Sequence, residues 1–337
     1  MRKTLPRGES HSAGAEFSFL ISQSSRHVIL FLILMATFSY GLFSTHRSFR
    51  AISKSLLEFQ TAFQGGGGST NATILSNSMC RVWGVTTTIF PPSPAIKQLI
   101  DHVPGACLVV VGDHKTASKL WRSYIQDEAL HERVLFLSDE DQKSLSFSII
   151  THLEWNHFGR KNIGYLVALQ HGAQWVYDFE DDTILLMPVN QTFFSKILIS
   201  KLTPIPVVKN NHHLFNPYPS FLPRDNIGRD LFVWPRGFPL DFIHDTDTSA
   251  FEAVTTIASD NISIFQSLAD NDPDVDAIYR MTGKLPITFS KHDSMISLSP
   301  GMFCPWNTQA VLMKSSVLWG ALLPVTVTGR VAGILRS

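Results

Sequence analysis

The stretch from Gly159 to Thr183 constrains the fold more than any other part of this 337-residue chain. Apolar residues recur at helical spacing in its first half, and Gly172 stands where a helix that ends in a left-handed residue needs glycine. The run from Gln174 to Tyr177 is typical of a short buried strand, because tryptophan, valine and tyrosine pack well on a pleated surface. This strand leads directly into four carboxylates: Asp178, Glu180, Asp181 and Asp182. The stretch therefore predicts a helix, a turn and a buried strand that ends in acidic residues.

Four carboxylates crowded at a strand end repel one another, which costs stability when no cation is present. The cluster is therefore either a solvated turn or a site for a hard divalent cation, which prefers oxygen ligands. Its position after a helix, a glycine and a buried strand favours the cation. We expect Asp181 and Asp182 to be the main ligands of Mg²⁺ or Mn²⁺, with Glu180 and Asp178 next. An EF-hand calcium loop does not fit, because Thr183 stands where that loop needs glycine.

Buried apolar runs alternate with helical patterns in the first half of the folded part. The expected strands are Val82–Phe90, Ala106–Val111, Val134–Leu137 and Trp175–Tyr177. Continuous apolar strands joined by helical crossovers predict an α/β, Rossmann-like fold, with a mixed and mainly parallel sheet covered by helices on both faces. With 44% hydrophobic residues, the chain has enough apolar side chains to bury such a core.

In such a sheet the carboxyl ends of the parallel strands meet at one edge, and ligands bind there. We expect Thr87 and Asp113 to contact a nucleotide at this edge, with a plain turn role as an equal alternative for Asp113. Arg160, Lys161 and Asn162 open the central helix, whose N-terminal amides suit an anion; simple solvation of the helix end is the alternative. No G-x-G-x-x-G pattern follows the first strand, which argues against a dinucleotide site.

The sixteen residues from Val28 to Phe43 carry no charge and predict a membrane anchor. As a helix they span about 24 Å, which suits a thinner bilayer. A cleavable signal peptide is the alternative, but the preceding region is long for one. We expect four parts: a cytosolic tail at 1–27, a transmembrane signal anchor at 28–43, a lumenal stem with a glycine-rich linker at 44–79, and one folded domain at 80–337.

Weaker signals accompany this division. The apolar residues of 49–63 follow a two-heptad pattern, which predicts a juxtamembrane amphipathic helix, with a weak dimer through the stem as the alternative. Glycosylation acceptor patterns favour a lumenal C-terminal part; they begin at Asn71, Asn190 and Asn261. The three cysteines, Cys80, Cys107 and Cys304, allow at most one disulfide. The formal net charge of zero gives no indication of a nucleic-acid partner.

Six segments of the sequence are similar to segments of one protein family. They read K-N-I-G-Y-L-V-A-L-Q-H-G-A-Q-W-V-Y-D at 161–178, N-P-Y at 216–218, W-P-R-G-F-P at 234–239, D-P-D-V-D-A-I-Y-R at 272–280, N-T-Q at 307–309 and W-G-A-L-L-P at 319–324. In this combination they resemble the STELLO-like family of Golgi glycosyltransferase-like proteins, over roughly residues 82–336. The central helix, glycine and acid-ended strand also look like the core of a GT-A glycosyltransferase.

The resemblance implies a GT-A-like fold in which an acidic motif, here Glu180 to Asp182, holds Mn²⁺ or Mg²⁺ on a nucleotide-diphosphate sugar. It implies a sugar transferase of cell-surface or wall polysaccharide synthesis, a single-pass type II protein of the Golgi membrane with a lumenal C-terminal domain. In that reading Arg236 pairs with phosphate, and Asp274 or Asp276 is the base that activates the acceptor hydroxyl. Structural roles in packed turns are the alternative for all three.

A different function is also compatible with the resemblance. It is a non-catalytic Golgi scaffold that binds a polysaccharide synthase and helps to export it. The family pattern continues past Gly329–Ser337, where this chain stops, so we expect a domain shortened at its C-terminus with an incomplete acceptor side. That expectation favours the scaffold, whereas the intact acidic triplet favours the enzyme.

Overall fold

The computed structural model describes residues 80–186, 204–291 and 294–323, and all of them belong to one compact unit, 55–337. The expected tail, anchor and stem lie outside the described residues, as do Asn71 and Asn190. Within the described ranges, no helix combines the length and the apolar character needed to cross a membrane.

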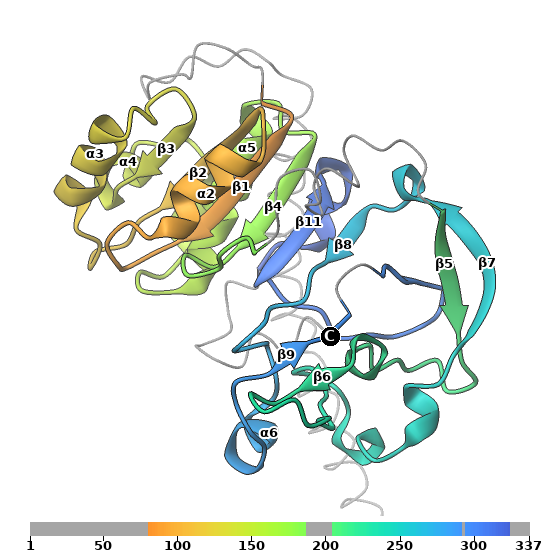
Figure 1. Ribbon diagram of the computed structural model, residues 1–337. Coiled ribbons are helices and arrows are strands. Elements are labelled where there is room, and N and C mark those ends of the chain that lie inside the picture. Colours follow the sequence, from red (N-terminus) through yellow and green to blue (C-terminus); the bar gives the residue numbers. More distant parts are fainter. Residues whose placement is uncertain (1–79, 187–203, 292–293, 324–337) are drawn as a thin grey trace, which may run out of the picture. The chain divides into compact units, whose positions relative to one another are not determined.

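A six-stranded mixed sheet is the largest sheet of the described part, with the strand order β3-β2-β1-β4-β11-β8 (Figure 1). Its strands are β1 (Val82–Thr87), β2 (Ala106–Val111), β3 (Val134–Leu137), β4 (Trp175–Phe179), β8 (Ile264–Gln266) and β11 (Ala310–Lys314). The first four are parallel, and β11 runs antiparallel to β4 on one side and to β8 on the other. The predicted mixed, mainly parallel α/β sheet is therefore confirmed.

Helices cover both faces of this sheet, as the continuous apolar strands require. The α-helices here are α2 (Pro94–His102), α3 (Ser118–Asp127), α4 (Asp139–Lys143) and α5 (Lys161–Gln170). On one face α2 and α3 bury Leu99 and Trp121 in a common apolar cluster. On the opposite face α5 packs against β1 and β2. All six residues of β2 are buried, because the strand is covered from both sides.

Glycines account for two features of α5. A Cβ atom at Gly164 would lie 2.4 Å from Cγ1 of Val85, so only glycine allows the helix to pack this closely on β1. Gly172 follows the helix with φ +81°, the left-handed conformation expected from the sequence.

Two strand boundaries differ from the expectation. β1 ends at Thr87 rather than Phe90, because the next side chain, Thr88, turns toward the acidic turn after β4. β4 extends to Phe179, two residues beyond the expected end, since β11 pairs with it as far as the register Ala310↔Phe179. A distant strand partner of this kind cannot be recognised in the local sequence.

The second half of the described chain contains smaller sheets and many turns. It includes β5 (Pro204–Lys209), β7 (Glu252–Ala258) and β10 (Ser297–Leu298) in one sheet, β6 (Pro223–Arg224) and β9 (Thr288–Phe289) in another, and α6 (Ala277–Thr282). Short 3₁₀ helices lie at Ser148–His152, Phe158–Arg160, Tyr218–Phe221, Leu240–Phe242, Thr246–Thr248, Ser259–Asn261 and Ser315–Gly320. The aromatic residues of the turn-rich motifs, Tyr218, Trp234 and Phe238, pack with Val275 and Tyr279 in a third core.

Candidate functional site

The candidate site is built at the carboxyl end of β4, where the strand gives way to a turn. Asp178 is still in the strand, and Glu180, Asp181 and Asp182 follow it. The backbone N–H of Thr183 donates to the carbonyl of Glu180 and closes the turn (3.0 Å). The predicted acidic strand end is therefore present, and its four carboxylates have different surroundings.

Asp178 is a member of a buried charge network. Its side chain is fully buried and forms an ion pair with Lys161, with 2.6 Å between Oδ1 and Nζ. Its Oδ2 accepts a hydrogen bond from the hydroxyl of Tyr165. Because both oxygens point into the core of the domain, Asp178 holds α5 against β4 and is not an open metal ligand.

Lys161 is the residue at this site whose role the sequence analysis missed. Its side chain is 2% exposed, and its Nζ also lies 3.3 Å from Oε1 of Glu180 and 3.4 Å from the carbonyl of Thr308. Burial alone lowers the pKa of a lysine, but Asp178 and Glu180 more than offset this, so the pKa of Lys161 lies above its ordinary value. The one available signal was a charged residue at the start of an otherwise apolar helix.

Asp181 and Asp182 face away from this network. The hydroxyl of Thr88 donates to Oδ2 of Asp181 (2.5 Å), and the hydroxyl of Ser93 donates to its main-chain carbonyl. Burial, together with the charges of Asp182 and Glu180, raises the pKa of Asp181, although the bond from Thr88 acts in the opposite direction. Repulsion among these carboxylates is relieved by a cation, and their oxygens suit Mg²⁺ or Mn²⁺. The type of these donor atoms suits the predicted metal, and its binding at this turn stays a prediction. Among the described residues, the ligand atoms that all lie within 4.8 Å of one another belong to His212, Asp245 and Asp247.

Next to this turn lies a cavity of about 840 Å³. Asp182 lines it from the turn after β4, Arg236 lines it from the W-P-R-G-F-P segment, and Asp272 lines it from the D-P-D-V-D segment. Asn307 and Gln309 complete the polar part of the lining. Motifs that are far apart in the sequence therefore meet around one cavity.

Gln309 connects the acidic turn to the second half of the chain. Its carbonyl accepts from the backbone N–H of Glu180 and from the hydroxyl of Thr183, both at 3.3 Å. Its side-chain amide donates to the carbonyl of Asp272 (3.2 Å). The N-T-Q segment thereby sets the position of the acidic turn relative to the D-P-D-V-D segment.

Asp274 lies beside this cavity in an ion pair with Arg236, with 2.5 Å between Oδ1 and Nη2. Its side chain is only 14% exposed. Burial raises the pKa of Asp274, and the neighbouring Arg236 opposes this effect. The predicted base, Asp274, and the predicted phosphate-binding residue, Arg236, thus form an ion pair with each other. The guanidinium of Arg236 can bind a ligand phosphate only if this ion pair opens.

Asp276 does not fit the predicted role of a catalytic base. It is the N-cap of α6: Oδ1 accepts from the backbone N–H of Tyr279 (2.7 Å), and Oδ2 accepts from the indole N–H of Trp234. A carboxylate with both oxygens used in this way stabilises a helix start. We correct the assignment of Asp276 to a structural one.

This correction can be tested by comparing two substitutions. We expect Asp276→Ala to lower the free energy of unfolding by about 1–2 kcal/mol, because the helix cap is lost. Asp276→Asn keeps one acceptor oxygen for the backbone N–H of Tyr279 but loses the acceptor for the indole N–H of Trp234, so it should lower this free energy by less than Asp276→Ala does. Thermal unfolding measures both. If Asp276→Asn folds normally but abolishes sugar transfer, the carboxylate is catalytic after all.

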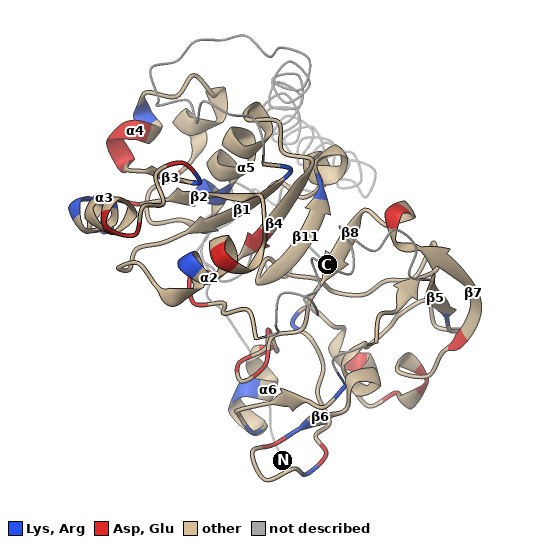
Figure 2. Ribbon diagram, turned by 45° about the horizontal axis from the view of Figure 1, so that its top comes forward, with Lys and Arg blue, Asp and Glu red and all other residues tan. Residues whose placement is uncertain are grey.

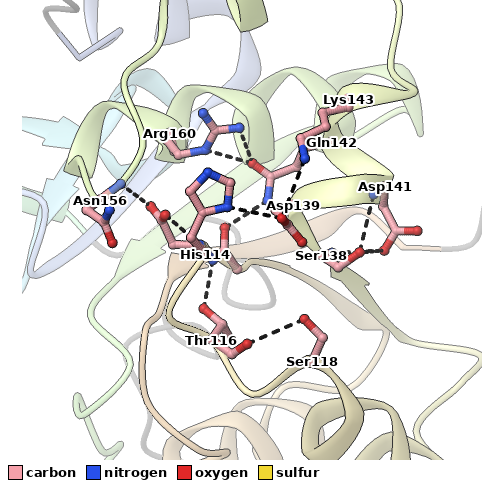
Figure 3. A network of polar contacts seen from close by, with 12 residues as sticks. His114, Thr116, Ser118, Ser138, Asp139, Asp141, Gln142, Lys143, Asn156 and Arg160 are labelled. Atoms are coloured by element: carbon pink, nitrogen blue, oxygen red, sulfur yellow. Dashed lines mark hydrogen bonds and ion pairs between the residues drawn. The ribbon is translucent and has the colours of Figure 1, made fainter.

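Arg160 belongs to a separate polar network at the ends of β2 and β3 (Figure 3), and Asp113 is part of it through His114 and Asn156. Arg160 is 1% exposed, donates twice to Oε1 of Gln142 and lies 3.3 Å from the ring centroid of Trp155. Burial lowers the pKa of Arg160 to about 10. Asp113 accepts from the backbone N–H groups of His114 and Asn156, both at 2.7 Å. A guanidinium enclosed in this way supports the loop and is not available to phosphate, so the predicted role of Arg160 is corrected.

The same network extends to α4, which is drawn mostly red in Figure 2 because its first turn carries three acidic residues. Asp139 of this helix pairs with His114 at 3.0 Å. The turn role that was the alternative for Asp113 is therefore the one its contacts favour.

The two remaining predicted nucleotide contacts are Asn162 and Thr87. Both ends of the Asn162 side-chain amide bond to the backbone of Leu323, each at 2.8 Å, so this residue ties α5 to the segment after β11. Thr87 ends β1, half-buried, with Val111 opposite it in β2. Its neighbour Thr88, which contacts Asp181, is the residue of this strand end that reaches the acidic turn.

Fold and site together define a class of protein: a mixed α/β domain whose central strand ends in an acidic turn beside a large cavity. The chain is related to the STELLO-like proteins. It is 28% identical over 266 residues to the probable glycosyltransferase STELLO2 of Arabidopsis thaliana, covering 76% of this chain and 32% of that protein. It is also 28% identical over 273 residues to the probable glycosyltransferase STELLO1 of the same plant, covering 78% and 33%. The resemblance to this family is confirmed, and the chain spans about a third of the length of these relatives.

No protein-family model matches the chain. Among solved structures, it resembles the mannosyltransferase PcManGT of Pyrobaculum calidifontis, in complex with GDP-mannose and Mn²⁺, at 14% identity and a TM-score of 0.23, over 47% of this chain and 44% of that one. A superposition of this quality does not define a shared fold.

Proposed function

We propose that the chain is a GT-A-type glycosyltransferase that uses a nucleotide-diphosphate sugar with Mn²⁺ or Mg²⁺ at Asp181 and Asp182. The observation that carries the proposal is the acidic turn itself, which borders a cavity of about 840 Å³, a size typical of ligand sites. The named relatives, which are probable glycosyltransferases, support it. Glu180 completes the metal set only if it leaves its ion pair with Lys161.

The reaction breaks the bond between the anomeric carbon and the phosphate oxygen of the donor. The acceptor oxygen forms the new bond to that carbon, the electron pair of the old bond leaves with the diphosphate, and the acceptor proton goes to a base. When bound, the divalent cation supplies positive charge for the leaving diphosphate. We assign the base to Asp274, because it lies beside the cavity and burial raises its pKa toward the range of an effective base.

We further propose that this domain lies in the Golgi lumen, behind a type II anchor at 28–43. The support is the disulfide between Cys80 and Cys107, since disulfides persist in oxidising compartments. The acceptor pattern at Asn261 is exposed at the surface and thus accessible to glycosylation. A polysaccharide product and a dimer through the stem belong to the same proposal.

The scaffold is a second candidate, and one observation favours it. Three of the residues expected to act on ligands, Arg160, Asn162 and Asp276, have structural contacts instead. A scaffold that keeps the fold and binds a polysaccharide synthase needs these residues only for their structural contacts, and not for contacts with a donor. The two candidates differ in whether the acidic turn binds a donor.

The test is calorimetric titration of the full chain with UDP-glucose in the presence and absence of Mn²⁺. We expect metal-dependent binding with a dissociation constant between about 1 μM and 1 mM. Asp181→Asn with Asp182→Asn should weaken it at least tenfold, about 1.4 kcal/mol, because the ligand oxygens lose their charge. The unfolding free energy without metal should not fall, since repulsion among the carboxylates is relieved.

The matched control is Asp127→Asn with Asp241→Asn, two exposed aspartates outside the cavity, which should leave binding unchanged. An unfolded Asp181 and Asp182 variant would mean that these carboxylates are structural. Absence of any metal-dependent binding by the wild-type chain would favour the scaffold.

A further inference from the structure

One wall of the cavity is apolar. Ile205, Ile262 and Phe265 line it and also pack with the core on that face of the sheet. Leu185 and Met295 extend the same wall. Ile264 on β8 also lines the cavity and is 41% exposed, so this apolar lining residue is open to a ligand.

The polar groups of the lining form a separate, connected set. The amide of Gln266 donates to Oδ1 of Asn307 (3.3 Å), and the same oxygen accepts from the backbone N–H of Gln309 (3.0 Å). Gln309 then reaches Asp272 on one side and the acidic turn on the other. The cavity thus has a hydrogen-bonding side that is continuous with the acidic turn, and an apolar side.

We propose that the acceptor is amphipathic: a sugar or hydroxyl group attached to an aliphatic chain, with the chain against the apolar wall. This deepens the proposed function and rests on it. A purely carbohydrate acceptor would place hydroxyl groups against isoleucine, leucine and methionine, where they find no hydrogen-bond partners. An aliphatic chain instead gains about fourfold in affinity for each methylene group that it buries. The hydrogen-bonding side then holds the polar head near Asp274 and the acidic turn.

The experiment compares hexyl β-D-glucoside with methyl β-D-glucoside, both titrated into the full chain and followed by saturation-transfer NMR. The hexyl group has five more methylene groups than the methyl group. If three of them are buried, hexyl β-D-glucoside should bind roughly 60-fold more tightly, at about fourfold for each buried methylene. Its alkyl protons should receive saturation from the protein. Equal affinities for the two glucosides would overturn the proposal.

Two substitutions locate the effect. Ile264→Asn places an amide among the apolar residues of the lining and should reduce the preference for the hexyl compound by at least about fourfold. Ile227→Asn is the matched control, because Ile227 is 68% exposed and does not line the cavity. If both variants lose the preference for the hexyl compound equally, or neither does, the alkyl group binds elsewhere on the protein and the proposal fails. Should Ile264→Asn not fold, Ile184→Asn on the same lining, 44% exposed, takes its place.

Failure here is distinct from failure of the proposed function. Binding of UDP-glucose with Mn²⁺ depends on Asp181 and Asp182, and it is measured without either glucoside. Donor binding without a hexyl preference refutes the amphipathic acceptor alone. A hexyl preference without donor binding refutes the transferase, and with it the acceptor role of this cavity.

Discussion

Replacing Lys161 by methionine should lower the free energy of unfolding by about 3–5 kcal/mol, the usual cost of breaking a buried ion pair. Methionine has a similar length and is apolar, so the loss comes from the charge and not from a cavity. Asp178, which is 0% exposed, would keep only the hydroxyl of Tyr165 among the two contacts described above. Chemical denaturation followed by circular dichroism measures this difference.

The control is the double variant Lys161→Met with Asp178→Asn, which removes both charges and should recover most of the lost stability.

The folded-state pKa of Lys161 is raised above its ordinary value of 10.5. The ion pair with Asp178 therefore contributes its full stability below that pH, and this contribution is lost only as the pH rises through the higher pKa. We therefore expect the contribution of the pair to the stability of the wild-type protein to be constant between about pH 6 and pH 9. A loss below 1 kcal/mol would mean that Lys161 and Asp178 are not paired in solution.

Removal of the disulfide should have the next largest effect. Cys80 and Cys107 are 27 residues apart and join the chain before β1 to β2. Closing a loop of this length restricts the unfolded chain, so Cys80→Ala with Cys107→Ala should lower the free energy of unfolding by about 3 kcal/mol. A reductant should destabilise the wild-type protein by a similar amount and leave the double variant unaffected.

Cys304 provides the control for this experiment. Burial raises the pKa of its thiol to about 12, so it resists modification, and Cys304→Ala should leave the response to the reductant unchanged. Thiol labelling of protein taken directly from cells tests the compartment as well. If Cys80 and Cys107 are found reduced there, the proposed lumenal location is wrong.

The central sheet was predictable from the sequence because its strands are local signals. A run such as Ala106–Val111 has no polar residue, and only a strand buried on both faces accommodates it. The parallel arrangement followed from the helical patterns between these runs. The antiparallel strands β8 and β11 were not predictable, because they lie far from their partners in the sequence and their positions depend on pairing with β4.

The position of the acidic turn was also predictable, but the roles of its individual residues were not. The acidic turn was found from residue type and spacing alone, whereas the roles of its members depend on burial. Asp178 and Asp181 are three residues apart and chemically identical. One is enclosed with Lys161 in the core, and the other lies at the edge of the sheet beside Thr88. No pattern in the sequence separates the two environments.

The sequence by itself therefore determined the parallel sheet, the central helix with Gly172 in the left-handed conformation after it, and the acidic end of β4. These features depend on side-chain size, apolar periodicity and backbone freedom, all of which act over a few residues. Only the tertiary structure decided that Arg160, Asn162 and Asp276 hold the fold together, and that Asp182, Arg236 and Asp272 share one cavity. Hydrogen-bond partners and burial are properties of residues brought together from distant parts of the chain, so they arise only when the chain has folded.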